Sequence, residues 1–163
     1  MIKLTPTYSE ILVSSLSRTE VTRRMGLVTD QVNFMDASVI KKNQISFFNG
    51  YIQGSRFQLS LKINKADSFL PLIKGEIEPT EKGCIIFLDY SFFPSTEFFL
   101  GFWGVITFLL TLFFLIFMQD WLFASLSVLV GTGNYFFAFF YFKRKVKQSQ
   151  RVFYEMMDIK VRE

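Results

Sequence analysis

The feature that most constrains this chain is an apolar run over residues 98–142. It holds 45 residues, 13 of the 22 phenylalanines and a single charge, Asp120, which divides it into the stretches 98–118 and 121–142. About 20 apolar residues let a helix cross the ~30 Å hydrocarbon layer of a membrane. Because a chain of 163 residues has too little other mass to bury two such helices, the run predicts a transmembrane helical hairpin that turns at Gln119 and Asp120, rather than a buried hairpin in a soluble protein.

Basic residues after the run predict its orientation. Residues 143–163 carry seven basic and three acidic groups, whereas residues 1–97 have a net charge of +1. Loops rich in Lys and Arg stay in the cytoplasm, and no apolar run near Met1 could act as a signal peptide. We therefore expect a multi-pass membrane protein with both ends in the cytoplasm.

The basic tail, residues 143–163, is expected to be helical and to contact lipid. Clusters of Lys and Arg beside a span commonly face anionic headgroups, at about 1 kcal/mol per residue. A plainer interpretation is that the cluster only sets the orientation and has no specific ligand. The side chains concerned are Lys143, Arg144, Lys145, Lys147 and Arg151.

Helix signals occur near the start of the chain. A capping-box pattern at Thr7 and Glu10, followed by apolar residues at helical spacing, predicts an amphipathic helix over residues 8–18. A second such pattern begins at Ser17 and predicts a short helix that ends at Gly26.

Beyond an ambiguous stretch over residues 27–44, the apolar residues alternate with period two and turn signals separate the segments. This pattern predicts an antiparallel meander of about four strands. One face of the meander needs cover, which the N-terminal helix, the C-terminal segment around Val146 and Phe153, or a second copy could supply. The expected strands cover residues 45–53, 57–63, 69–78 and 84–93.

Together these expectations define the fold class as an α+β membrane protein. Residues 1–97 form a cytoplasmic β-rich domain with an N-terminal helix, residues 98–142 form the hairpin, and residues 143–163 form a basic tail with a short C-terminal helix.

The arrangement resembles a group of small uncharacterised bacterial two-span membrane proteins with an N-terminal cytoplasmic β-rich domain. The resemblance depends on the segments 48–52, 57–59 and 68–77, followed by a hairpin and a charged tail. It covers about residues 45–163, leaves out residues 1–44, and implies an architecture and a location in the bacterial inner (cytoplasmic) membrane. It implies no activity.

Small and polar residues interrupt both expected spans. Folding the chain about its turn brings Thr107 near Thr132. Three uses of these residues are open: packing within one hairpin, self-association of several hairpins, or the lining of a pore. The residues that would form such an interface are Gly101, Gly104, Thr107, Thr111, Ser127, Gly131, Gly133 and Asn134.

Composition excludes much catalytic chemistry. His is absent and Cys84 is the only cysteine, which removes zinc sites, disulfides and His-based acid–base chemistry. Cys84 is expected to be a buried, inert thiol. Glu76 and Glu78 share one face of an expected strand with Lys74, where a solvated surface is favoured over an acid–base or cation site. We expect no cofactor and no bound metal.

Three functions remain open at this stage. The leading hypothesis is a non-enzymatic membrane protein whose β-rich domain docks a partner or senses a ligand, while the hairpin anchors and oligomerises it. The alternative is an oligomeric membrane effector or channel gated by that domain. A third is an enzyme that acts on lipid through Glu76, Glu78 or Asp89. The near-neutral domain lacks a basic face interleaved with aromatic residues, which argues against nucleic-acid binding.

Overall fold

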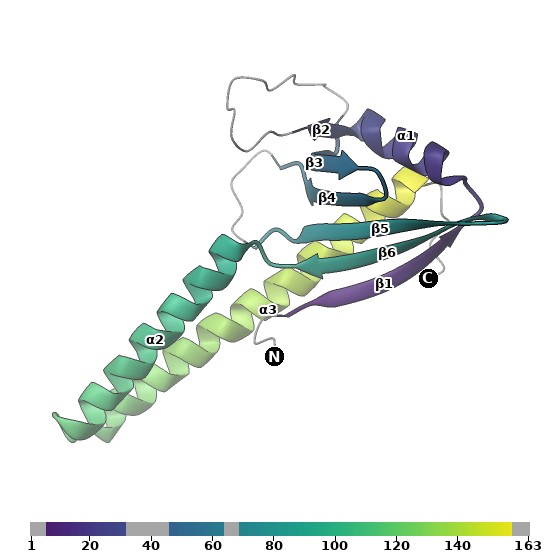
Figure 1. Ribbon diagram of the computed structural model, residues 1–163. Coiled ribbons are helices and arrows are strands. Elements are labelled where there is room, and N and C mark those ends of the chain that lie inside the picture. Colours follow the sequence, from purple (N-terminus) through teal and green to yellow (C-terminus); the bar gives the residue numbers. More distant parts are fainter. Residues whose placement is uncertain (1–5, 32–45, 64–68, 158–163) are drawn as a thin grey trace.

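The computed structural model describes residues 6–31, 46–63 and 69–157 of the chain, and it shows an α+β fold. A six-stranded sheet is covered on one face by helices, and a two-helix hairpin projects from one end of it (Figure 1). The strands are β1 (Tyr8–Ser14), β2 (Thr29–Gln31), β3 (Phe48–Gln53), β4 (Arg56–Leu61), β5 (Leu72–Thr80) and β6 (Gly83–Ser91). The helices are α1 (Arg18–Val28), α2 (Pro94–Ile116) and α3 (Trp121–Met157).

The sheet has the strand order β1-β6-β5-β4-β3-β2. The predicted antiparallel meander is confirmed, because each strand from β3 to β6 pairs antiparallel with the next. The sheet is wider than predicted. β1 pairs antiparallel with β6 at one edge, and the short β2 pairs parallel with β3 at the other.

The helix predicted over residues 8–18 is wrong, because Tyr8–Ser14 forms strand β1. Leu12 faces the covered side of the sheet and Ile11 the open side, so apolar residues on both faces imitate helical spacing. The next prediction is confirmed at its start, where the Ser17 hydroxyl accepts a 3.3 Å hydrogen bond from the Glu20 amide. That helix continues through Gly26, where we expected it to end.

Thr29–Gln31 resolves part of the ambiguous stretch as strand β2, whereas residues 32–45 lie outside the described residues. Gly75 on β5 shows how closely the covered face is packed. A Cβ atom there would lie 2.1 Å from the Phe57 ring, so only glycine fits.

α3 is one continuous helix of 37 residues, about 55 Å long. The tail that we predicted to be helical is helical as far as Met157, but it continues the second hairpin helix instead of forming a separate short one, because no glycine or proline interrupts the chain between residues 134 and 157. Its buried positions recur every three or four residues or at multiples of this spacing, which defines one stripe along the whole helix. They are Ala124, Ala138, Phe142, Val146, Ser149, Phe153 and Met157.

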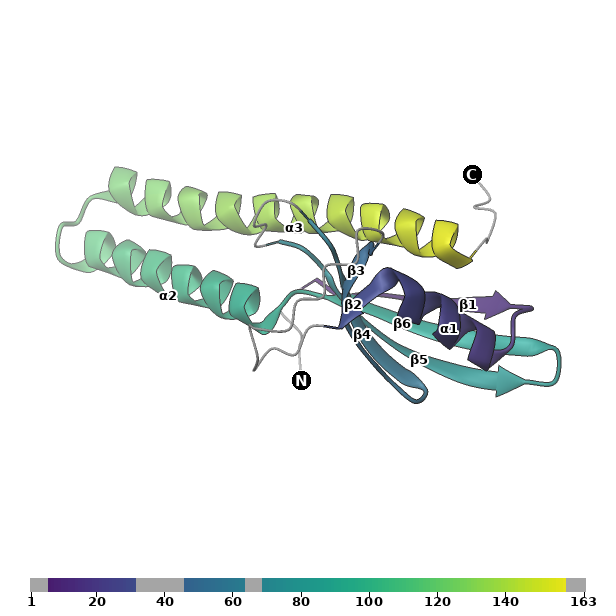
Figure 2. The same ribbon diagram turned by 90° about the horizontal axis from the view of Figure 1, so that it is seen from above.

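The two parts of α3 pack against different elements. Its first part lies beside α2 in the hairpin, and its last part crosses the covered face of the sheet (Figures 1 and 2). Phe153 is fully buried against the rings of Phe48 and Phe57. The C-terminal segment therefore supplies the cover that the meander needed, together with Val21 and Met25 of α1.

The polar break in the apolar run forms the hairpin turn, as predicted. Gln119 has a positive φ of 51°, and the Asp120 carboxylate accepts hydrogen bonds from the amides of Leu122 and Phe123. Asp120 is therefore the N-cap of α3. Both helices of the hairpin are long and apolar enough to cross a membrane, judged by length and composition.

Candidate functional site

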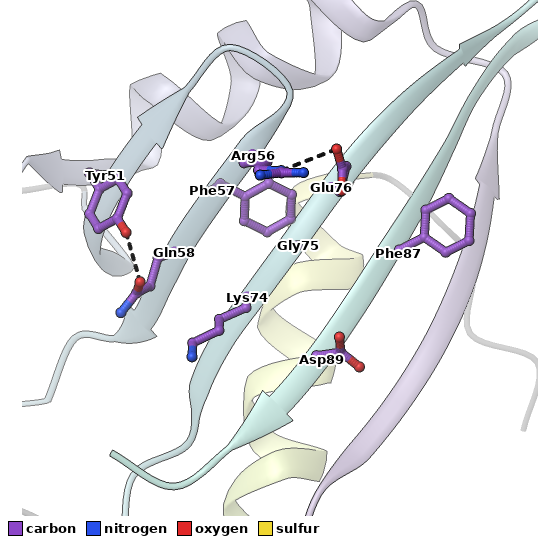
Figure 3. Close-up of a pocket in the computed structure, with 9 residues that line it drawn as sticks. All are labelled: Tyr51, Arg56, Phe57, Gln58, Lys74, Gly75, Glu76, Phe87 and Asp89. Carbon is purple, nitrogen blue, oxygen red and sulfur yellow. Dashed lines mark hydrogen bonds and ion pairs between the residues drawn. The ribbon is translucent and has the colours of Figure 1, made fainter. Parts of the chain in front are cut away.

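The open face of the sheet, opposite α1 and α3, contains a shallow hollow of about 320 Å³ (Figure 3). Two aromatic residues, Tyr51 and Phe87, lie on its opposite sides. Strands β3, β4, β5 and β6 all contribute to it. Its lining residues are Tyr51, Arg56, Phe57, Gln58, Lys74, Gly75, Glu76, Phe87 and Asp89.

Strand alternation and register explain this grouping. Gln58 on β4, Lys74 on β5 and Asp89 on β6 occupy directly opposed positions, so their side chains share the open face. Arg56 and Glu76 are likewise opposed, and their side chains form an exposed ion pair of 3.2 Å. The hollow thus places two cations and two carboxylates between two aromatic rings.

The second cation of the hollow is Lys74. Within the described parts of the chain its exposed ammonium forms no ion pair, although Asp89 lies opposite it. Asp89 instead accepts a hydrogen bond from Ser9 of β1, and the Tyr51 hydroxyl donates to the side-chain amide oxygen of Gln58 at 2.8 Å. This arrangement suits the binding of a polar or charged group.

The two carboxylates that the sequence places on one face of a strand, Glu76 and Glu78, have different surroundings in the structure. Glu76 and Glu78 lie on the open face as expected, but Glu76 pairs with Arg56 and Glu78 is exposed opposite Ile85, outside the hollow. No cluster of three or more His, Cys, Asp or Glu side chains suited to a metal ion occurs among residues 6–31, 46–63 and 69–157.

Cys84 is fully buried in the core, where we expected it. Burial raises the pKa of its thiol, because the thiolate form would lose its hydration. A protonated, inaccessible thiol is a poor nucleophile.

A polar cluster that the sequence did not reveal joins β1 to α3. The Glu10 carboxylate accepts hydrogen bonds from the Tyr90 hydroxyl at 2.8 Å and from the Gln150 amide and the Tyr154 hydroxyl, each at 2.6 Å. Burial, and then the negative charge and hydrogen bond of Glu10, raise the pKa of both tyrosines well above the ordinary value. Both therefore stay protonated donors, and the cluster fixes the edge strand against the covering helix.

No signal in the sequence pointed to this cluster. From the sequence, Glu10 was assigned to a helix-capping pattern. Its three partners lie 80, 140 and 144 positions further along the chain. The pairing of β1 with β6 brings Tyr90 near Glu10, and the packing of α3 on the sheet brings Gln150 and Tyr154.

The hairpin brings some of the predicted interface residues together. A Cβ atom on Gly131 would lie 2.8 Å from the Thr107 hydroxyl oxygen, so the two helices approach closely at this level. The expected opposition of Thr107 with Thr132 is one residue off, because Thr132 is exposed. The predicted residues that are half-buried are Thr107, Thr111, Ser127, Gly131 and Asn134.

Three of the predicted glycines face away from the partner helix. Gly101, Gly104 and Gly133 are exposed, and a Cβ atom on any of them would meet nothing within 4 Å. The hydroxyls of Thr107, Thr111, Ser127 and Thr132 all donate to carbonyl oxygens of their own helices.

The basic residues of the predicted tail lie on the last part of α3 rather than on a free segment. Lys143, Arg144, Lys147 and Arg151 are exposed, and Lys145 is half-buried. The Lys143 ammonium lies 4.6 Å from the centre of the Phe139 ring, and Arg151 pairs with Glu155 at 3.0 Å.

Comparisons of this chain with protein-family models, curated proteins and solved structures find no match. The resemblance to bacterial two-span proteins therefore stays a prediction.

Proposed function

We propose that this chain is a non-enzymatic integral membrane protein of the bacterial inner membrane. Its hairpin anchors and oligomerises it, and its sheet domain lies in the cytoplasm and docks a partner or a ligand on the open face. The observation that carries the proposal is the surface of the hairpin. Large apolar side chains cover its outward faces, and among the described residues nothing packs over them.

The apolar surface is too large for water. Leu129 and Phe140 are each 68% exposed, and most other large apolar residues of the hairpin are also exposed. Each such side chain gains about 1.5–3 kcal/mol when it leaves water, so the total strongly favours lipid. The turn between α2 and α3, which contains Asp120, lies at the far tip of the hairpin (Figure 1), where it would reach the opposite membrane surface.

The continuous α3 supports a mechanical link between membrane and domain. Because one helix forms half of the anchor and also covers the sheet core, the domain cannot reorient freely on a flexible linker. A partner bound to the open face would be held at a fixed place above the membrane.

Docking on the open face is supported by the fact that none of the described helices packs on it. α1 and α3 pack on the other face, which buries its apolar side chains, whereas the open face carries the hollow with Lys74 and the Arg56–Glu76 pair. Polar contacts around a partly apolar centre are typical of binding surfaces.

Oligomerisation is supported by Asn134. Its side chain is half-buried in the middle of the second span and has no hydrogen-bond partner in the part of the chain that the structure describes. An unpaired amide in hydrocarbon costs free energy that a second hairpin could recover. Gly101, Gly104 and Gly133 leave outward surfaces where a second helix could approach closely.

Cysteine labelling tests the anchor and its orientation. In a Cys84→Ala background, Gln119→Cys at the hairpin tip should react with an impermeant maleimide only from outside the cell. Lys82→Cys, in the exposed β5–β6 turn, is the matched control and should react only after the cytoplasm is opened. Reaction of Gln119→Cys only from the cytoplasmic side, or a chain that stays soluble without detergent, contradicts the proposal.

Native mass measurement in nanodiscs tests oligomerisation. We expect more than one copy per disc for the parent chain and fewer for Asn134→Leu. Thr132→Val is the matched control, because its hydroxyl already bonds to Val128 of its own helix. A strict monomer for the parent chain contradicts this part of the proposal.

A further inference from the structure

In the described part of the chain, the outer edge of β1 is an unguarded sheet edge. β1 pairs with β6 over all seven residues without a bulge, and among the described residues no strand pairs with its other side. Natural proteins usually protect such edges with lysine, proline, a bulge or a covering element. β1 contains no lysine, arginine or proline, and its one charge, Glu10, is turned inward to Tyr90, Gln150 and Tyr154.

On the open face the edge presents an apolar row. Ile11 is 64% exposed and Val13 is 77% exposed, which is unusual for β-branched residues in a sheet. They are paired with Phe87 and Ile85 of β6, whose side chains continue the row inward. A strand added at this edge would place alternate side chains against Ile11 and Val13.

On the covered face the same edge is flanked by positive charge. Lys143, Lys147 and Arg151 are spaced four apart and form one row on α3. Gln150 and Tyr154 follow Lys147 by three and seven positions, so this row lies on the side of α3 that reaches β1 through Glu10. The inward side chains of an added strand would run along these cations.

A second copy does not fit this edge by antiparallel pairing through its own β1. β1 runs away from the hairpin along the same general direction as the last part of α3 (Figures 1 and 2). Antiparallel pairing of two β1 strands would point the two hairpins in opposite directions, which excludes their insertion in one membrane. This step depends on the proposed anchor function.

We propose that β1 binds an extended acidic segment of a partner protein by strand addition. Acidic side chains of the segment alternate with apolar ones. The acidic side chains face Lys143, Lys147 and Arg151, the apolar ones contact Ile11 and Val13, and the main chain pairs with the free edge of β1. This docking site lies at the sheet edge and is separate from the hollow on the open face.

A synthetic peptide tests the proposal on the full chain in nanodiscs of zwitterionic lipid. The probe is a fluorescent nine-residue peptide in which valine alternates with glutamate, and its control has lysine in place of glutamate. We expect fluorescence anisotropy to show binding of the glutamate peptide at least tenfold tighter than that of the lysine peptide. Hydrogen exchange of β1 amides should slow when the glutamate peptide is bound.

Two double variants test the apolar row of β1 and the basic row of α3 separately. Ile11→Lys with Val13→Lys should weaken binding at least tenfold, and both positions are exposed enough for the fold to persist. Lys147→Glu with Arg151→Glu should reverse the preference toward the lysine peptide. Lys145→Glu is the matched control, because Lys145 lies two positions from Lys147 and so on the opposite side of α3, over the Tyr141 ring. Circular dichroism verifies that each variant is folded.

Each contrary outcome overturns strand addition. The proposal is contradicted if the glutamate peptide fails to bind at millimolar concentration or if both peptides bind equally. It is also contradicted if the glutamate peptide binds without slowing hydrogen exchange of the β1 amides. Loss of binding when the nanodisc contains anionic lipid would assign the basic row to the membrane surface instead. These results leave the cysteine-labelling pattern unchanged, so failure here is distinguishable from failure of the anchor.

Discussion

The two parts of α3 have the same buried stripe but different surroundings. From Trp121 to Phe142 the exposed side is rich in Phe, Leu and Val, whereas from Lys143 to Met157 it carries Lys, Arg and Gln. The buried stripe shows that each part of α3 packs against another element. The composition of the opposite side indicates the surroundings of the helix, which are lipid for the first part under the proposed function and water for the second.

The size of the buried residues also differs between the two parts. The buried Ala124 and the half-buried Gly131 lie in the hairpin, whereas the buried Phe142 and Phe153 belong to the sheet core. Small residues let two helices approach closely when no water can be expelled between them, and large residues fill the deeper gap between a helix and a sheet. One helix therefore uses two packing solutions.

The largest expected effect distinguishes the two parts directly. Phe153→Ala should destabilise the sheet domain by about 3–5 kcal/mol, because it empties the space against Phe48 and Phe57. Phe140→Ala removes the same ring from an outward position of the hairpin and should change domain stability by less than about 1 kcal/mol. Denaturant unfolding followed by far-ultraviolet circular dichroism measures the loss of stability in both variants. Equal losses would mean that the exposed side of the hairpin is also packed.

A smaller effect should come from the closest helix contact. Gly131→Leu forces the helices apart at Thr107 and should cost the hairpin about 1–3 kcal/mol. Gly101→Leu is the matched control, since its position is open, and should leave the contact intact. Thermal unfolding in detergent compares them. A harmless Gly131→Leu would show that the helices are not in close contact.

Next comes the cluster that ties β1 to α3. Tyr90→Phe removes one hydrogen bond to Glu10 and should cost about 0.5–1.5 kcal/mol at neutral pH. Because the folded state raises the pKa of Tyr90 above the unfolded value of about 10, its contribution is present below that pH and is lost as the pH rises above it. Tyr90→Phe should therefore flatten the alkaline loss of stability. An unchanged alkaline profile would contradict the assignment.

The smallest effect concerns the surface of α1. Ion pairs with Arg23 and Arg24 lower the pKa of Glu20 to about 2. The carboxylate therefore stabilises the helix above its unfolded pKa of about 4.3, and this stabilisation is lost as the pH falls toward 2. Acid unfolding of Glu20→Gln should lack this component. Exposure keeps the effect slight, and a large difference would indicate a buried role for Glu20.

The elements that could be predicted from the sequence are those whose pattern of apolar residues has a single structural interpretation. The apolar run split by Asp120 predicted the two hairpin helices, and strict alternation from Phe57 to Ile63 predicted β4. β1 was missed because Ile11 and Val13 leave apolar residues on its open face as well as its covered face, which hides the period of two.

The candidate sites were harder to predict than the elements. The hollow needs the register of four strands, which brings Gln58, Lys74 and Asp89 side by side although they are distant in the chain. Likewise Glu10 gained its partners only through the pairing of β1 with β6 and the packing of α3 on the sheet. The charge row on α3 was visible in the sequence, but its position beside a sheet edge was not.

The central claim is that one rigid helix joins the membrane hairpin to the sheet domain. Spin labels at Leu126 and Gln148, both exposed on α3, lie 22 positions apart and on nearly the same side, so an unbroken helix separates them by about 33 Å. In a Cys84→Ala chain in nanodiscs, we expect pulsed electron paramagnetic resonance to give one narrow distance distribution near that value. A broad distribution, or one centred at a much shorter distance, would show a break at the membrane surface and contradict the account.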